Sequence, residues 1–388
     1  MTFKKTILFI HRWLGFTSGL VVFIVSITGC IFCFQDEIQD AIYSWRKVEI
    51  QHEPYVAPST LKNIAIAKYP GAAANYIYYF GADRPAAVLA NVKKQGYTYI
   101  YIDPYNAKVL HTEGLNDNFF TIIKSIHLYL LLPEKAGQLV VGTSVIIFVV
   151  LMITGIVLWW PKRKSDRKRS FTIKWGSRWR RINYDLHNVL GFYATAIAII
   201  LALTGLSMAF TWVNTGIYKA ANLGKNYPDE AIFPKSDTTG KVVVAAQPVA
   251  DRVFFEVKTS EPNAQMFLIA DDGTKGGTIN ITAYRESMHF GKSDDYYYDR
   301  YTGRLLKYLP DVKKSAGMKL TDLNYDIHVG QIWGLPSKII AFLGSLICAT
   351  LPVTGFIIWL GKRKKPKKQK KREVTHRRTH KQMLRAGQ

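Results

Sequence analysis

Four histidines stand at the ends of long apolar stretches, where ionisable side chains are costly and usually functional. His11 and His187 begin two of these stretches, and His127 and His328 precede the other two. The pentapeptides at 183–187 (NYDLH) and 324–328 (NYDIH) share four of their five letters, so two of the histidines recur in one local context. Histidine is a common ligand of protein-bound metals, which makes the four positions candidates for a metal or haem site.

The elements that position these histidines are membrane-spanning helices. Four stretches carry no charged residue, at 13–35, 136–161, 186–218 and 339–361. Each is at least as long as the ~20 apolar residues that cross a bilayer as a helix. A backbone in lipid must satisfy its own hydrogen bonds, which favours helices. The sequence therefore predicts an all-α four-helix transmembrane bundle, with spans at 7–35, 136–161, 183–213 and 336–361.

The net charge of +24 is confined to three segments. Residues 1–12, 162–181 and 362–388 hold 26 of the 52 Lys and Arg residues but only two acidic ones. Positively charged loops stay in the cytoplasm, so both termini and the loop at 162–182 are expected inside. This orientation, together with attraction to anionic lipids, accounts for the basic tail at 362–388, which we expect to be disordered. Binding to nucleic acid is not expected.

The two outward segments, 36–135 and 214–335, each read as a small α+β domain. In the first, a helix capped at Ser59 or Thr60 precedes strand-like runs and the turn DPYN. The segment YIDPYNAKVL (101–110) aligns with YYDRYTGRLL (297–306), and each span ends in or near a Thr-Gly pair at matching distances from its histidine. The chain therefore reads as an internal duplication of helix, outward domain, helix.

Helix direction alternates, so each membrane face receives one histidine from each half. His11 and His187 lie at the inner face, and His127 and His328 at the outer face. Two imidazoles from opposed helices are what a six-coordinate haem iron needs. The covalent motif CxxCH does not occur, so the pattern predicts two non-covalent b haems. Gly15 and Gly191 lie one turn after their histidines and leave room for a porphyrin edge. Asp185 and Asp326 are candidates to hold the far ring nitrogen, or to cap the helix that follows.

Other interpretations of the histidines remain open at this stage. Any one of them, taken alone, is more often an interfacial anchor than a ligand. Zinc is a weaker hypothesis, because each face supplies two histidines and no evident Cys or Glu to complete a tetrahedron. His111 or His289, both on outward segments, is an alternative partner at the outer face.

Several motifs resemble the PepSY-associated transmembrane family. HRWLGFTSGL, DLHNVLGFYATAIAIILALTG, GIVLWWPKR and TGFIIWLGKR are similar to its four spans, and YIYIDPYNAKVL and YYYDRYTGRLL to the ends of PepSY domains. The resemblance implies a bacterial inner-membrane ferrisiderophore reductase with two b haems on His11, His187, His127 and His328. Its substrate would be a ferric siderophore or other ferric chelate in the periplasm, and its electrons would come from a quinol or a separate cytoplasmic reductase. The alternative is a non-catalytic, membrane-anchored PepSY protein that senses or restrains a peptidase.

Overall fold

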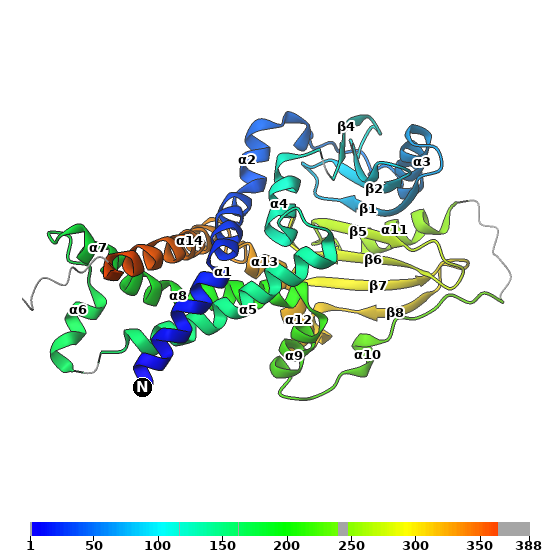
Figure 1. The fold of residues 1–388 in the computed structure, drawn as a ribbon. Coiled ribbons are helices and arrows are strands. Elements are labelled where there is room, and N and C mark those ends of the chain that lie inside the picture. Colours follow the sequence, from blue (N-terminus) through cyan, green and yellow to red (C-terminus); the bar gives the residue numbers. More distant parts are fainter. Residues whose placement is uncertain (1, 116, 162, 240–246, 364–388) are drawn as a thin grey trace, which may run out of the picture.

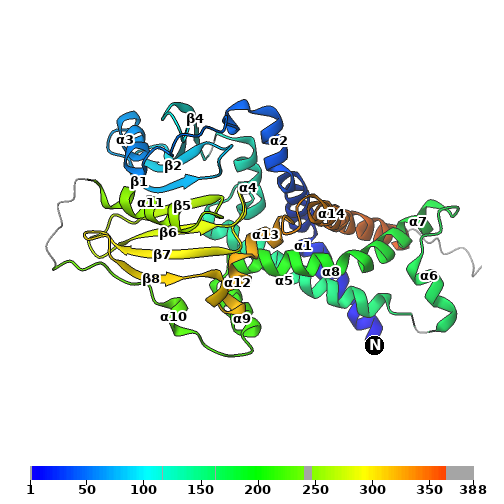
Figure 2. The same cartoon turned by 180° about the vertical axis from the view of Figure 1, so that it is seen from behind.

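The computed structural model describes residues 2–115, 117–161, 163–239 and 247–363. A helical part and a sheet part lie at opposite ends of the molecule (Figure 1), and the amino terminus lies at the helical end. The view from behind shows the same division (Figure 2). Residues 364–388, which make up nearly all of the predicted basic tail, lie outside the described residues.

Within the described residues, four helical segments are long and apolar enough to cross a membrane. They are α1 (Phe3–Cys33), α5 (Glu134–Trp159), the continuous segment Trp179–Ala209, and α14 (Leu335–Arg363). The third segment joins α7 (Trp179–Asp185), a π-helical turn η3 (Leu186–Leu190) and α8 (Gly191–Ala209). The first and last residues of each helical segment lie within four residues of the bounds predicted from the sequence. The agreement arises because the charge-free stretches set the apolar length of each helix.

The four spans form a ring of neighbours. The helix α1 packs against α5 and α14, and α8 also packs against α5 and α14. The helices α1 and α8 therefore face each other across the bundle, as do α5 and α14. Side chains that point inward from α1 and α8 meet in the centre, which is the usual location of cofactor sites in helical bundles.

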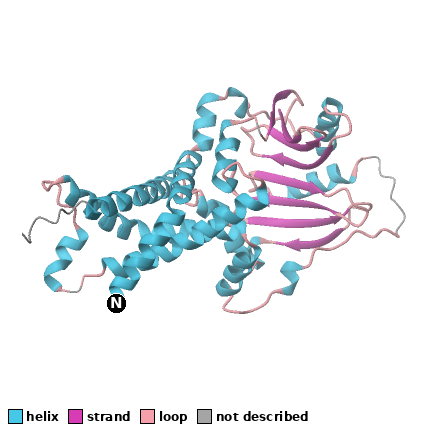
Figure 3. Cartoon of the chain, in the orientation of Figure 1, coloured by secondary structure: helices cyan, strands magenta, loops and turns pink. Residues whose placement is uncertain are grey.

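The outward segments form one continuous antiparallel sheet of eight strands, in the order β4-β3-β2-β1-β5-β6-β7-β8. Figure 3 shows the strands, in magenta, side by side at one end of the molecule. The first half supplies β1 (Ala73–Tyr79), β2 (Ala86–Val92), β3 (Gly96–Ile102) and β4 (Val109–Gly114). The second half supplies β5 (Met266–Asp271), β6 (Thr278–Tyr284), β7 (Ser293–Asp299) and β8 (Leu305–Leu309). Each half thus contributes four consecutive strands, and each set follows one helix, α3 (Pro58–Lys68) or α11 (Val249–Ser260).

The sequence predicts two separate outward domains, whereas the structure joins the two segments in one sheet. Strands β1 and β5 pair directly, with Tyr76 opposite Ala270 and Tyr79 opposite Phe267. The helices α3 and α11 pack on each other and on the strands of their own halves. One apolar core therefore runs across both halves. The physical reason is that each four-stranded unit has a free edge, and pairing the two edges satisfies backbone groups that would otherwise stay unpaired.

Short helices connect the sheet to the spans. They are α2 (Gln35–Ile42), η1 (Ser44–Arg46), α4 (Phe119–Tyr129), α9 (Thr211–Ala221), α10 (Pro228–Ala231), η4 (Asp311–Lys313), α12 (Ala316–Asp322) and α13 (Asn324–His328). At the far end of the bundle lie η2 (Lys164–Asp166) and α6 (Arg167–Phe171). Two of these connectors carry histidines of the predicted site: α4 holds His127 and α13 holds His328.

Phe254→Ala is expected to lower the free energy of unfolding by about 3–5 kcal/mol, the usual cost of deleting a buried phenylalanine ring. Phe254 of α11 is fully buried and stacks on Tyr79 of β1, with ring centroids 4.6 Å apart, so this contact crosses from one half to the other. Hydrogen exchange should therefore rise in the strands of both halves. The exposed Val312 provides the control Val312→Ala. Exchange that rose only in β5–β8 would contradict a shared core.

Candidate functional site

Each of the four histidines makes a hydrogen bond to a threonine on a neighbouring helix. The distances from Nδ1 to the threonine Oγ1 are 2.8 Å for His11 and Thr154, 2.9 Å for His187 and Thr354, 3.1 Å for His127 and Thr28, and 2.9 Å for His328 and Thr204. All four threonines belong to the Thr-Gly pairs that recur along the sequence. The same local contact is therefore built four times, twice at each end of the bundle.

The surroundings of each threonine favour one tautomer of the histidine that it contacts. A threonine hydroxyl has one proton to donate. In each threonine, that proton goes to the backbone carbonyl four residues earlier, as in Thr154 to Val150 at 2.8 Å. The carbonyl three residues before each threonine is a further acceptor for the ring. This arrangement favours the tautomer in which Nδ1 donates to the threonine and Nε2 is unprotonated, the form of imidazole that can bind a metal through Nε2.

The glycine after each threonine makes room for the imidazole. A Cβ atom on Gly205 would lie 3.0 Å from Cε1 of His328, and one on Gly355 would lie 3.1 Å from Cε1 of His187. The corresponding distances are 3.3 Å for Gly29 and His127 and 3.6 Å for Gly155 and His11. Sequence reasoning used the Thr-Gly pairs only as markers of the duplication. The Thr-Gly pairs recur at matching distances from the histidines in the two halves, and this regularity is the sequence signal for their place in the site.

The inner cavity, at the end of the bundle far from the sheet, has a volume of about 750 Å³. His11 and His187 both line it, one from α1 and one from the π-helical turn that precedes α8. Gly15 and Gly191 line it too. Apart from its own stretch of helix, no atom lies within 4 Å of the position of a Cβ on Gly15, whereas a Cβ on Gly191 would lie 3.3 Å from Cδ2 of Leu351. The structure thus brings the predicted inner residues together in a space of the size usual for cofactor sites, ~300–1,000 Å³.

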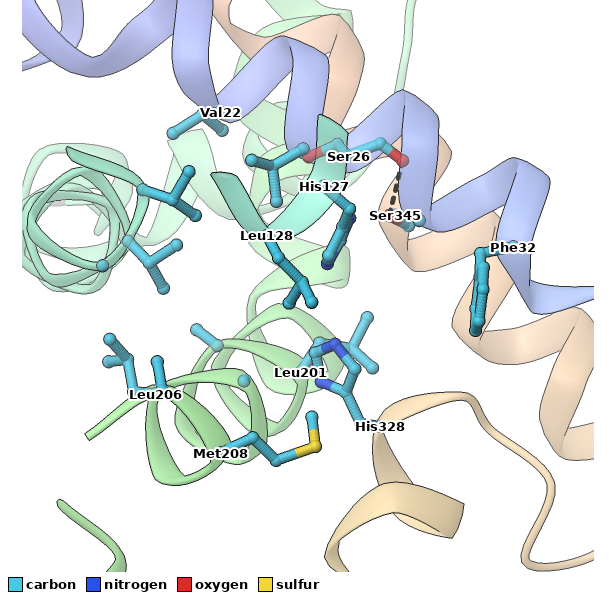
Figure 4. A pocket seen from close by; sticks show the side chains of 18 of the residues that line it. Val22, Ser26, Phe32, His127, Leu128, Leu201, Leu206, Met208, His328 and Ser345 are labelled. Carbon is cyan, nitrogen blue, oxygen red and sulfur yellow. Dashed lines mark hydrogen bonds between the residues drawn. The ribbon is translucent and has the colours of Figure 1, made fainter. Parts of the chain in front are cut away.

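The outer cavity, next to the sheet, has a volume of about 450 Å³ and is lined by His127 and His328. Figure 4 shows the two rings facing each other, one from α4 and the other from α13, among mainly apolar side chains. Burial, and to a smaller extent the neighbouring His127, lower the pKa of His328 to about 4. Burial also lowers the pKa of His127. Both rings are therefore neutral at pH 7, and neutral imidazole is the form that binds a metal.

The spacing of the outer pair fits two ligands on one metal. The ring centroids of His127 and His328 are 6.1 Å apart. A metal–imidazole bond is about 2 Å and the centroid lies about 1 Å further, so two rings on one metal have centroids about 6 Å apart. Among the described residues, no group of three or more His, Cys, Asp and Glu side chains is placed to hold a metal ion. Two opposed imidazoles match haem, whose macrocycle supplies the remaining ligands.

The two cavities share two lining residues, Val22 of α1 and Phe148 of α5. These side chains therefore lie between the inner and outer spaces, and Figure 4 shows Val22 at one end of the outer cavity. His11 and Gly29, which belong to opposite layers, are 18 residues apart on α1. At ~1.5 Å per residue this corresponds to about 27 Å, most of the thickness of a bilayer core.

In each copy of the NYDxH motif, the asparagine and the histidine both hydrogen-bond to the threonine of one Thr-Gly pair. In the first copy, the amide of Asn183 donates to the carbonyl of Thr354 at 3.0 Å, while His187 binds the hydroxyl of the same threonine. In the second copy, Asn324 donates to the carbonyl of Thr204 at 3.2 Å, and His328 binds its hydroxyl. Residues four apart on a helix share one face, so a single threonine is held at both polar groups.

The tyrosines of the motif line the cavities, Tyr184 the inner one and Tyr325 the outer one. Each copy therefore gives its cavity one tyrosine and one histidine. Burial raises the pKa of Tyr325, with smaller contributions from nearby acidic side chains, so this phenol keeps its proton near neutral pH.

The expected role of Asp185 and Asp326 is wrong, because threonines hold the far ring nitrogens instead. Asp185 forms an ion pair with Arg181 at 2.7 Å, and Asp326 accepts from the backbone N–H of Gly291 at 2.9 Å and from the amide of Gln331 at 2.6 Å. Asp185 stands before the π-helical turn without a side-chain cap hydrogen bond, and the contacts of Asp326 are made to the loop at 290–291 and to Gln331. Both are almost fully buried, and they anchor the motif to neighbouring backbone rather than to the ring.

His111 and His289 lie away from the described lining of the outer cavity. The ring of His111, on β4, stacks on Trp45 with centroids 4.4 Å apart and lies 3.6 Å from Glu113. Nδ1 of His289 lies 3.0 Å from a carboxylate oxygen of Glu286. The geometry therefore pairs His127 with His328 at the outer face, and not with either alternative.

Apolar spans that enclose two histidine-lined cavities, joined to an eight-stranded sheet, define a multi-pass membrane protein. The chain matches the family model of the PepSY-associated TM region over residues 8–362 and belongs to that family. No curated protein matches the sequence.

Proposed function

We propose that the chain is a transmembrane di-haem b electron-transfer protein that reduces ferric siderophores, or other ferric chelates, and so releases Fe(II) for iron uptake. The observation that carries the proposal is the fourfold imidazole contact. The four histidines line two cavities, two per cavity, each with Nδ1 hydrogen-bonded to a threonine, and the outer pair has the 6.1 Å centroid spacing of ligands on one metal.

His11 and His187 would hold the inner haem, and His127 and His328 the outer one. A bound haem would supply one-electron transfer through its iron. The chain's own contribution is to fix each ring through a threonine, to leave space through a glycine, and to surround the site with apolar side chains that exclude water. The four equivalent contacts support an internal duplication, in which each half supplies one ligand to each cavity.

The orientation follows from the distribution of charge. The loop between α5 and α7 and both termini are basic, which supports a cytoplasmic location for them in a bacterial inner membrane. The sheet then lies in the periplasm, next to the outer cavity. Electrons would enter from a quinol or a cytoplasmic reductase at the inner cavity and leave at the outer one. Fe²⁺ is softer than Fe³⁺ and binds hard oxygen ligands less tightly, so reduction favours release from a chelate.

The alternative, a non-catalytic PepSY protein that senses or restrains a peptidase, gives the four imidazole contacts no role. The two proposals predict different visible absorbance for the purified protein. Protein purified from haem-replete cells should show Soret and α bands that sharpen with dithionite if the first is correct. A colourless preparation would support the second.

Reduction of ferric chelates can be measured directly on the full chain in lipid nanodiscs. The protein is reduced with dithionite, freed of excess reductant and mixed with a ferric trihydroxamate in the presence of a chromogenic Fe(II) chelator. We expect the haem bands to return to the oxidised form while the Fe(II) complex appears in proportion. A protein that stays reduced and releases no Fe(II) would contradict the proposed reductase activity.

A further inference from the structure

The inner cavity has a cationic mouth that the outer cavity does not share. Its described lining includes four basic side chains and no acidic one: Lys4, Lys5, Arg12 and Lys362. The outer cavity has one basic and one acidic lining residue, Lys124 and Glu134. The mouth formed by the four basic residues lies at the cytoplasmic ends of α1 and α14, which pack against each other.

Two of these lysines lie at equal distances along their helices from the level of an imidazole. Lys4 precedes His11 by seven residues on α1, and Lys362 follows Gly355 by seven residues on α14. Gly355 is the residue against which the ring of His187 packs. Seven residues are two helical turns and about 10 Å, so each lysine lies on the same face as its reference residue, about 10 Å along the helix axis from the level of an imidazole, and both lysines line the cavity.

Positive charge at the cytoplasmic ends of spans is expected for orientation alone, but the four cations differ in their surroundings. The guanidinium of Arg12 lies 5.9 Å from the ring centroids of both Phe9 and Trp13, which are exposed on the outside of the bundle. Lys4 donates one hydrogen bond to the carbonyl of Trp160 at 3.1 Å and keeps two donors for a ligand. Arg12 thus belongs to the outer surface, whereas Lys4 is held at the mouth.

We propose that Lys4 and Lys362 form a carboxylate-binding site that takes the two carboxylates at one edge of the inner macrocycle. The inference rests on the proposed function, since that macrocycle is the haem between His11 and His187. The carboxylate edge would then face the cytoplasm, and the apolar edge would face Val22 and Phe148 at the centre of the bundle. The outer cavity, which has one basic and one acidic lining residue, would not favour one orientation of the carboxylate edge in this way.

The test compares haem b with its dimethyl ester, which has the same iron and ring but no carboxylates. Full-length His328→Ala protein, prepared without haem in nanodiscs, offers the inner cavity alone and is titrated with each compound while absorbance is recorded. We expect haem b to bind more tightly than the diester. Lys4→Gln/Lys362→Gln should weaken haem b by about fivefold per lysine, as for partly exposed ion pairs, and leave the diester unchanged. The preference should also shrink at high salt.

Lys168→Gln/Arg169→Gln is the matched control, because it removes two exposed charges from the same side, outside the described lining of the cavity. Equal affinities for haem b and its diester in the parent protein would overturn the inference, as would the same loss in the control variant. If the lysines hold an anionic lipid headgroup instead, the diester will bind as tightly as haem b, and changing from neutral to anionic lipid will weaken both. Failure to bind either compound in the native chain would refute the proposed function itself.

Discussion

His328→Ala is expected to leave the protein with one haem instead of two and to lower reduction of ferric chelates by at least 100-fold, to background. The ring of His328 faces His127 with centroids 6.1 Å apart, and the two line the cavity nearest the sheet. If these two histidines hold the outer haem as proposed, the variant would keep only one imidazole to hold it. The remaining inner haem is separated from the sheet by most of the bilayer thickness. Haem content and chelate reduction are measured on the same preparation.

Alanine variants of the other three histidines should fall into two groups, one for each cavity. His127→Ala is expected to remove the same outer haem, and His11→Ala and His187→Ala are each expected to remove the inner one, because those two line the inner cavity. His111→Ala and His289→Ala serve as controls and should retain both haems. If redox titrations grouped His11 with His127, the assignment of one pair to each cavity would be wrong.

Thr204→Val is expected to weaken binding of the outer haem by about 10–100-fold, the usual effect of removing the partner of a metal-bound histidine. Valine keeps the shape of threonine but cannot form the hydrogen bond that joins Thr204 Oγ1 to Nδ1 of His328 at 2.9 Å. The ring of His328 then loses the contact that fixes its tautomer and orientation. Transfer of haem to an excess of a soluble haem-binding protein gives the rate of loss for each site.

Thr204→Ser is the matched control, because it keeps the hydroxyl and should bind haem nearly as tightly as the native chain. The variant Thr354→Val makes the same test at the inner cavity, where Thr354 binds His187 at 2.9 Å. The midpoint potential of the affected haem should shift in each valine variant and not in the serine variant. A valine variant with native affinity and native potential would show that the threonine only fills space.

The spans and the grouping of the histidines could be predicted from the sequence because both depend on local features. A charge-free stretch must form a helix that crosses the bilayer, and the direction of successive helices must alternate. Those two facts place His11 beside His187 at one face and His127 beside His328 at the other. The structure shows the same pairs in two cavities.

The single sheet could not be predicted, because it depends on a pairing between distant segments. Strands β1 and β5 are nearly two hundred residues apart in the chain, and each has the alternation expected of any strand. Nothing in the local pattern says whether the edge of a four-stranded unit stays free or pairs with another unit. The fusion of the two outward segments is therefore a result of tertiary structure.

The hydrogen-bond partners of the histidines were missed for a related reason. Asp185 and Asp326 are close to their histidines in sequence, but their carboxylates bind Arg181 and the backbone near Gly291. Residues two apart on a helix do not face each other, so the aspartate side chains point away from the rings. The threonines that bind the rings lie on other helices, and only the packing of the bundle brings them close.

The most direct test of the account is the ratio of haem to protein in the purified full-length chain, determined together with a redox titration. Four histidines in two cavities predict about two b haems per chain, with absorbance bands of six-coordinate, bis-histidine iron and two resolvable redox steps. A ratio near zero in protein from haem-replete cells, with the sheet and spans folded, would contradict the assignment of the histidines as haem ligands.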